Sequence, residues 1–213
     1  MNFLRKHWYD LGVLFAIVII VFIFTQHNNL TNYQLLMWLS LVSLFLHQTE
    51  EYRLVGTFPG MLNTVMYKSE TPNRYPLNTN SAFYVNVVTG WLFYFLAAVF
   101  AEKAVWLGIA TILVSVGNVI VHTIVFNIKG KTIYNAGLAT SWLFFVPCAF
   151  FFFSIIHAKH LATKTDYLIG VPLGIILMIF GIAKLVEWLA DKNTSYIFED
   201  RNLLPKDRKG SRR

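Results

Sequence analysis

Six long apolar segments alternate with short polar ones along the chain. Most are close to or above the roughly 20 residues that an α-helix needs to cross the hydrocarbon core of a bilayer. The predicted spans are 8–26, 33–52, 82–101, 104–128, 137–157 and 166–190. Aromatic residues stand at the ends of the last span, as expected of side chains at the level of the lipid headgroups. The pattern predicts an all-α polytopic membrane protein, a bundle of about six transmembrane helices.

Only one connecting segment, 53–80, is long, and it contains Pro59, Gly60, Pro72 and Pro76. Proline and glycine interrupt helices, so this segment is predicted to be an irregular loop, with a re-entrant stretch as an alternative. The sequence has no internal repeat. We therefore expect a single transmembrane helical domain over 1–200, followed by a basic tail over 201–213.

The basic residues fall unevenly between the two sides of the predicted bundle. With six spans, one side receives the C-terminal tail and Arg5, Lys6, Arg53, Lys68, Arg74, Lys129 and Lys131. The other side receives Lys103, Lys159 and Lys164. Because cytoplasmic loops of membrane proteins are enriched in Lys and Arg, we predict that both termini are cytoplasmic and that the protein lies in the cell membrane.

The first apolar segment has an alternative interpretation, since a basic start followed by an apolar core also describes a signal peptide. The residues that follow, 25–29, show no pattern of small residues for cleavage. We favour an uncleaved first helix.

Composition supports a membrane protein and narrows its partners. The chain is 56% hydrophobic and 14% charged, with a net charge of +7. Soluble domains carry roughly 25% charged residues. The positive charge is densest in the tail, where it favours contact with anionic membrane lipids, and no motif predicts binding to nucleic acid. Cys148 is the one cysteine, which excludes an intramolecular disulfide.

A polar motif, HQTEE at His47–Glu51, closes the second span. Residues three and four apart share a helix face, so His47 should lie beside Glu50 and Glu51. An imidazole and two carboxylates can bind a metal ion or exchange a proton. The simpler alternative is a polar helix end in which Arg53 pairs with one carboxylate. Capping does not explain the motif, because carboxylates at a helix C-terminus oppose the helix dipole.

The antiparallel order of the spans brings other polar residues to a similar depth. Asn86 lies in the first turns of the third span, and Asn118 and His122 lie one turn apart in the fourth. Buried polar groups in lipid need partners, and ionisable ones are functional candidates. The structural alternatives are hydrogen bonds between helices for the two asparagines and a satisfied core histidine for His122.

For two further sets of polar residues, the sequence favours a structural role. Lys184 and Glu187 are one turn apart near the end of the sixth span, which is typical of an ordinary intrahelical ion pair. The segment 134–137 is interpreted as the turn into the fifth span.

These motifs together resemble the HXXEE family of small membrane proteins. HQTEE at 47–51 matches the defining motif, and Asn118 with His122 is similar to the family's later Asn and His pair. The family's Tyr-x-Pro-Gly-Leu-x-Thr stretch is matched at Tyr134–Thr140, except that Ala136 replaces the proline and so changes the turn geometry to be expected. The resemblance extends from the second to the fifth span. It implies a membrane fold and brings no established biochemical function.

The leading hypothesis is a membrane-embedded enzyme that acts at the inner leaflet on a lipid or another apolar small molecule. Its expected metal ligands for Zn²⁺ or non-haem iron are His47, Glu50, Glu51 and His122. Either carboxylate would act as a general base if it stayed unbound, and the amides would orient ligands or polarise a substrate oxygen. The candidate catalytic residues are therefore Glu50, Glu51, Asn86 and Asn118. The loop over 53–80 is expected to cover the site.

Two other functions stay open at this stage. The same carboxylates suit a small transporter or proton-coupled carrier, although repeats and paired broken helices are missing. A non-catalytic membrane scaffold would need the polar cluster only for stability. A two-metal centre is disfavoured, because such sites in bundles use four Glu and two His residues.

Overall fold

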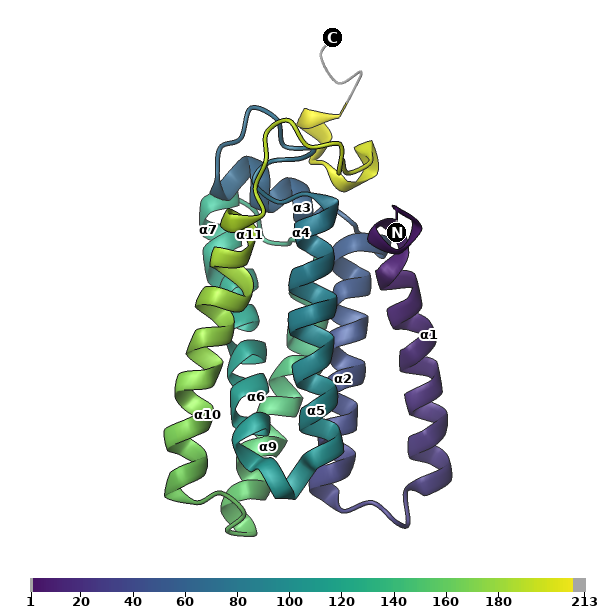
Figure 1. The fold of residues 1–213 in the computed structure, drawn as a ribbon, viewed down its shortest axis with the longest axis vertical. Helices are drawn as coiled ribbons and strands as arrows, with labels where there is room; N and C mark the ends of the chain where they lie inside the picture. The colour runs from purple at the N-terminus through teal and green to yellow at the C-terminus, as the bar shows by residue number, and fades with distance from the viewer. Residues whose placement is uncertain (1, 209–213) are drawn as a thin grey trace.

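Six long helices run up and down in an antiparallel bundle, in a computed structural model that describes residues 2–208 (Figure 1). They are α1 (Asn2–Gln26); α2 with η1 (Asn32–Thr49 and Glu50–Leu54); α4, η3 and α5 (Thr79–Phe83, Tyr84–Trp91 and Leu92–Phe100); α6, η5 and α7 (Val105–Ile120, Val121–Val125 and Phe126–Gly130); α8, η6 and α9 (Leu138–Thr140, Ser141–Phe145 and Val146–Ala158); and α10, η7 and α11 (Lys164–Ile176, Leu177–Lys184 and Leu185–Trp188). The described residues contain no strand. The prediction of an all-α bundle of six helices is confirmed.

Four helical stretches of the described chain are long and apolar enough to cross a membrane. They are Phe3–Gln26, Thr79–Gly130, Leu138–Ala158 and Lys164–Trp188. The second of these contains two antiparallel helices, which meet at the short η4 (Ala101–Ala104), where Ala101 has a φ of 43°. The helix α2 with η1 is not in this set, and its polar end carries the HQTEE motif.

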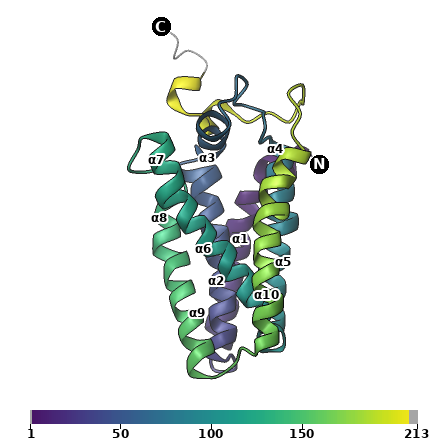
Figure 2. The same ribbon diagram turned by 90° about the vertical axis from the view of Figure 1, so that its left-hand side faces the viewer.

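Close helix contacts follow from small residues. Two glycines of α10, Gly170 and Gly174, lie against the backbone of α6, where an added Cβ would come within 2.6 Å of Trp106 O and 3.1 Å of Ala110 O. Such spacing of small residues lets two helices approach closely in a membrane. Helix α6 crosses the bundle obliquely, between α9 and α10 (Figure 2).

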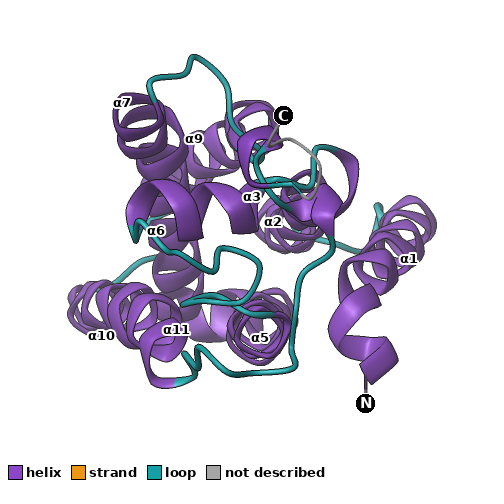
Figure 3. Cartoon of the chain, turned by 90° about the horizontal axis from the view of Figure 1, so that it is seen from above, coloured by secondary structure: helices purple, strands orange, loops and turns teal. Residues whose placement is uncertain are grey.

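Two segments, together called the cover, lie over the end of the bundle at which both described chain ends are found (Figures 1 and 3). The first contains α3 (Phe58–Gly60) and η2 (Met61–Met66), so the loop predicted over 53–80 is partly helical. The second contains η8 (Asp200–Asn202) and η9 (Pro205–Asp207). The Asn202 side chain joins them to the bundle, because it donates hydrogen bonds to Tyr52 O at 3.2 Å and Gly56 O at 2.9 Å. The tail predicted over 201–213 is described only as far as 208; its last residues lie outside the described part.

Candidate metal centre

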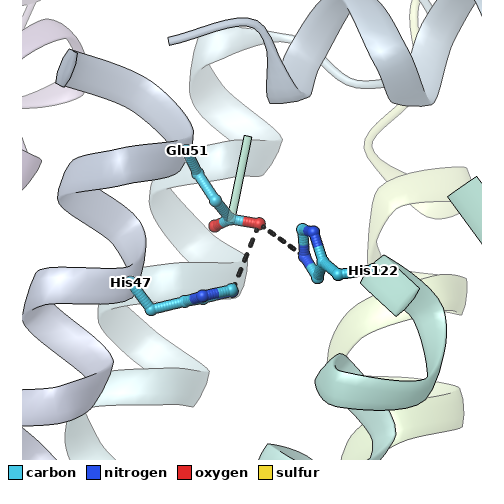
Figure 4. Close-up of side chains that lie close together, drawn as sticks. All are labelled: His47, Glu51 and His122. Carbon is cyan, nitrogen blue, oxygen red and sulfur yellow. Dashed lines mark ion pairs between the residues drawn. The ribbon is translucent and has the colours of Figure 1, made fainter. Parts of the chain in front are cut away.

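Three buried side chains from two helices converge beneath this cover (Figure 4). His47 closes α2, Glu51 lies one turn later in η1, and His122 lies in η5. Glu51 Oε1 lies 3.5 Å from His47 Nε2 and 3.3 Å from His122 Nε2. No ligand atom of the three is more than 4.8 Å from another. Both η1 and η5 are π-helical, a widened geometry that is frequent at functional sites.

The orientation of His122 is fixed by Asn135. Asn135 Nδ2 donates to His122 O at 2.7 Å and to Asn127 Oδ1 at 2.8 Å, which identifies Oδ1 of Asn135 as the remaining acceptor. His122 Nδ1 lies 2.7 Å from that oxygen and is therefore the protonated nitrogen of the ring. Nε2 of His122 is left with its lone pair facing Glu51.

His47 is held in the same way by Thr140 and Glu50. The Thr140 hydroxyl donates to Glu50 Oε2 at 2.6 Å, so its oxygen accepts the proton of His47 Nδ1 at 3.0 Å. The Nε2 atoms of His47 and His122 are both buried and have no hydrogen-bond partner among the described residues. Buried polar atoms without partners are rare in proteins and indicate an ion or water that completes them.

Aromatic rings and a glycine enclose the two imidazoles. Phe145 lies 4.6 Å from the His47 ring, and Phe58 of the cover stacks on the His122 ring at 5.9 Å, measured between ring centres. Gly137, with a φ of 103°, brings its backbone against both imidazoles. These apolar contacts lower the local dielectric on their side of the trio, which strengthens electrostatic interactions there.

A cavity of about 530 Å³ opens beside the trio, between α2, η3, α6 and η7 and beneath the cover. Its size lies in the range of small-molecule sites, roughly 300–1,000 Å³. His47, Glu51 and His122 line its polar end, together with Gln48, Tyr52, Asn86 and Asn118. Apolar side chains form most of the remaining wall, among them Phe93, Val114, Leu177, Met178 and Ile182.

The structure separates the two motif carboxylates. Glu51 joins the histidines, whereas Glu50 turns toward the loop after α7 and accepts hydrogen bonds from Tyr134 Oη, Thr140 N, Thr140 Oγ1 and Ala139 N. Glu50 is therefore placed behind His47 and outside the trio. Arg53 pairs with Asp10 at 3.1 Å, so it is not the partner of either glutamate.

The two candidate amides line the cavity at a distance from this trio. Asn86 accepts a hydrogen bond from Gln48 Nε2 at 3.0 Å, and Asn118 donates to Val114 O of its own helix at 3.0 Å. Neither bonds to His47, Glu51 or His122 in the described structure. Lys184 and Glu187 form the expected intrahelical pair at 2.6 Å.

The sequence pattern predicted a turn at 134–137 and did not reveal that residues 134–140 support the histidines. Asn135 and Thr140 orient the imidazoles, Gly137 packs against them, and Tyr134 donates to Glu50 at 2.6 Å. Burial and the hydrogen bond to this carboxylate raise the pKa of Tyr134 above its ordinary value, so the hydroxyl stays a donor at neutral pH. The available signal was the spacing Tyr-x-x-Gly-x-x-Thr directly after the His122 helix.

Comparison with known proteins gives a family and no further relative. No curated protein and no solved structure gives a significant match to the chain. One family profile, described as a protein of unknown function with an HXXEE motif, matches residues 38–152, which is more than half of the chain. The matched region contains every residue of the trio and of its hydrogen-bonded support. The chain therefore belongs to the HXXEE family of proteins of unknown function.

Proposed function

We propose that this protein is a membrane-embedded, metal-dependent enzyme that acts on an apolar molecule held in the cavity beside His47, Glu51 and His122. The observation that carries the proposal is the pair of buried, unpartnered Nε2 atoms aimed at one carboxylate oxygen. Two imidazoles and one carboxylate form a ligand set used by catalytic zinc and by non-haem iron, both of which keep positions open for water or substrate.

Two of the three separations within the trio agree with a zinc site, and the third is no more than 4.8 Å. Ligand atoms about 2.0–2.2 Å from a tetrahedral Zn²⁺ lie about 3.3–3.6 Å from each other. The two measured distances to Glu51 Oε1, 3.5 and 3.3 Å, fall in this interval. Each histidine also has the hydrogen bond at Nδ1 that metal-binding imidazoles use to fix their tautomer. A bound zinc ion would supply a water molecule that ionises near neutral pH.

The position of the trio supports an apolar substrate. It lies at the wall of a mainly apolar cavity, inside a bundle in which four helical stretches of the described chain are long and apolar enough to cross a membrane. A molecule dissolved in lipid can enter between such helices without first crossing water. We propose that the site faces the cytoplasmic leaflet, which the distribution of basic residues supports.

Elemental analysis tests the metal. The full chain, purified in detergent through a tag without histidine, should contain about one equivalent of Zn²⁺, and His122→Ala should lose it. His157→Ala is the matched control, because His157 is exposed on α9 and belongs to no ligand group in the described structure. A parent protein without any bound transition metal would refute the proposal.

Lipid profiling tests catalysis separately from metal binding. Membrane lipid extract is incubated with the metal-loaded parent or with His122→Ala, and its species are compared by mass spectrometry. We expect at least one lipid to be consumed by the parent only. Identical profiles with a metal-loaded parent would reject the enzyme and favour a carrier or scaffold.

A further inference from the structure

A second polar group lines the same cavity and plays no part in holding the trio. Gln48 and Tyr52 lie one residue after His47 and Glu51, on the adjacent face of the same helix, and both are 1% exposed. Asn86 of η3 connects them. The helix thus carries the candidate metal ligands His47 and Glu51 on one stripe, and Gln48 and Tyr52 on a neighbouring stripe that also lines the cavity.

Trp91 fixes the direction of every hydrogen bond in this group. Its indole N–H can only donate, and it donates to Gln48 Oε1 at 2.7 Å, so Gln48 Nε2 faces Asn86 Oδ1 at 3.0 Å. Asn86 Nδ2 then donates to Ala82 O at 2.9 Å and to Tyr52 Oη at 3.3 Å. The Tyr52 oxygen is an acceptor in this chain of bonds.

Two donors are left over at the end of the chain of bonds. The hydroxyl hydrogen of Tyr52 and the second amide hydrogen of Gln48 have no acceptor in the described structure, although both side chains are buried and line the cavity. A buried donor without an acceptor destabilises the folded protein, because it has lost its hydrogen bonds to water. A ligand oxygen in the cavity would remove that destabilisation.

The charge of the cavity wall limits what carries this oxygen. None of the described residues that line the cavity is Lys or Arg, the side chains that usually bind phosphate and carboxylate groups. A divalent cation would be balanced by the carboxylates of Glu51 and Glu50, so the polar end offers little attraction to an anion. The rest of the wall suits a hydrocarbon chain.

We infer that the substrate is a neutral single-chain amphiphile with an acyl carbonyl, such as a fatty ester or amide. This inference rests on the proposed function. The carbonyl oxygen of this substrate accepts hydrogen bonds from Tyr52 and Gln48 at the metal end of the cavity. Its alkyl chain extends along Phe93, Val114 and Leu177. Tyr52 and Gln48 are specificity-determining residues in this assignment, and the trio is not altered by changing them.

A matched pair of ligands tests the assignment on the purified full chain. The dissociation constants of 1-monooleoylglycerol and of its ether analogue, 1-O-oleylglycerol, are measured by native mass spectrometry; the two differ only in the carbonyl. Two hydrogen bonds to the carbonyl should make the ester bind the parent about tenfold to 100-fold more tightly, since one hydrogen bond contributes about threefold to tenfold. In Tyr52→Phe, which keeps the Gln48 donor, this preference should fall about threefold to tenfold. Equal binding to the parent, or the same preference in Tyr52→Phe, would overturn the inference.

A second variant keeps the test independent of any folding defect. A Cβ added at Gly90 would lie 3.5 Å from Gln48 Nε2 and 3.6 Å from Leu44 Cδ2, which are ordinary contacts. Gly90→Ala should therefore fold at least as well as the parent while it screens the Gln48 amide, and ester binding should weaken several-fold. Unchanged ester binding would contradict the role of Gln48.

The same samples are used to test the preference for a neutral headgroup and to measure the zinc content of the protein. An anionic ligand of the same chain length, 1-oleoyl lysophosphatidate, should bind more weakly than the ester, and tighter binding would overturn the neutral headgroup. Zinc content should stay at the parent level in both variants. A metal-free parent that still prefers the ester would refute the proposed enzyme and leave the ligand assignment standing.

Discussion

Replacing Gly137 with alanine tests whether the loop after α7 holds both imidazoles in place. The φ of 103° at this position is one that L-residues rarely adopt. A Cβ would overlap Cε1 of His122 and would lie 2.8 Å from its Nδ1 and 2.9 Å from His47 Cε1. These are ring atoms of side chains whose Nδ1 atoms are hydrogen-bonded, so they cannot rotate away freely. To restore an ordinary contact of about 3.5 Å, the His122 ring must move by roughly 1 Å and the His47 ring by roughly 0.5 Å.

The expected losses follow from this displacement. A non-glycine residue held at such a φ costs about 1–3 kcal/mol, and the overlap with the rings brings the expected loss of unfolding free energy to about 2–4 kcal/mol. Metal sites tolerate ligand displacements of only about 0.2 Å. We therefore expect Gly137→Ala to lower zinc affinity at least 10–100-fold, the range seen when the support of a ligand is lost.

Gly56→Ala provides the matched control for this experiment. Gly56 also has a positive φ, 76°, but its added Cβ would meet no atom closer than 3.5 Å. Both variants should unfold at a lower temperature than the parent in the same detergent, and only Gly137→Ala should lose zinc by elemental analysis. Equal zinc affinity in the two variants would refute the claim that this loop positions the histidines.

Three further predictions concern the two carboxylates, the support of His122 and the topology. Glu50→Gln should lower stability by about 1–3 kcal/mol and weaken zinc binding by no more than about 10–100-fold, because Glu50 only supports His47 through Thr140. Glu51→Gln removes a ligand and should lose zinc altogether; equal loss of zinc in the two variants would contradict these separate roles. Asn135→Ala removes the hydrogen bond that orients His122 and should weaken zinc binding about 10–100-fold. Zinc affinity is measured by competition with a chelating dye, and an unchanged affinity would contradict this role of Asn135. Reporter fusions at the two ends should both report the cytoplasm, and an external signal from either end would contradict the proposed orientation.

The helices could be predicted from the sequence because lipid imposes a simple length rule. A run of apolar residues must be about 20 residues long to span the hydrocarbon, so each predicted span lies within a few residues of a helix, except the first, which begins at residue 2. The helices of the cover could not be predicted from this length rule, because they are too short to span a membrane. The helical stretch over 58–66 packs closely on a part of the chain that is distant in the sequence, because a Cβ added at Gly60 would lie 2.6 Å from Leu204 N.

The candidate site could be predicted only in part, for a geometric reason. The i, i+4 spacing placed His47 beside Glu51, and antiparallel order placed His122 at the same depth. The same rule placed Glu50 beside His47, but the helix widens into a π-turn at Glu50, and this carboxylate points to the 134–140 loop. Neither the π-turn nor a loop that folds back on its own helix has a periodicity that the sequence pattern reveals.

A bound metal ion would satisfy the buried trio better than added protons would. Both histidines commit their Nδ1 protons to Thr140 and Asn135, so in the neutral form two Nε2 lone pairs face a carboxylate oxygen with no hydrogen between them. Protonating Nε2 would create two hydrogen bonds to one oxygen at 3.5 and 3.3 Å, longer than the 2.7–2.9 Å of strong charge-assisted bonds. Protonating both histidines would also place two cationic rings side by side among apolar side chains, with their ring centres 4.9 Å apart. One divalent cation bound by the three acceptors would need no added proton, which is why metal content is the decisive measurement.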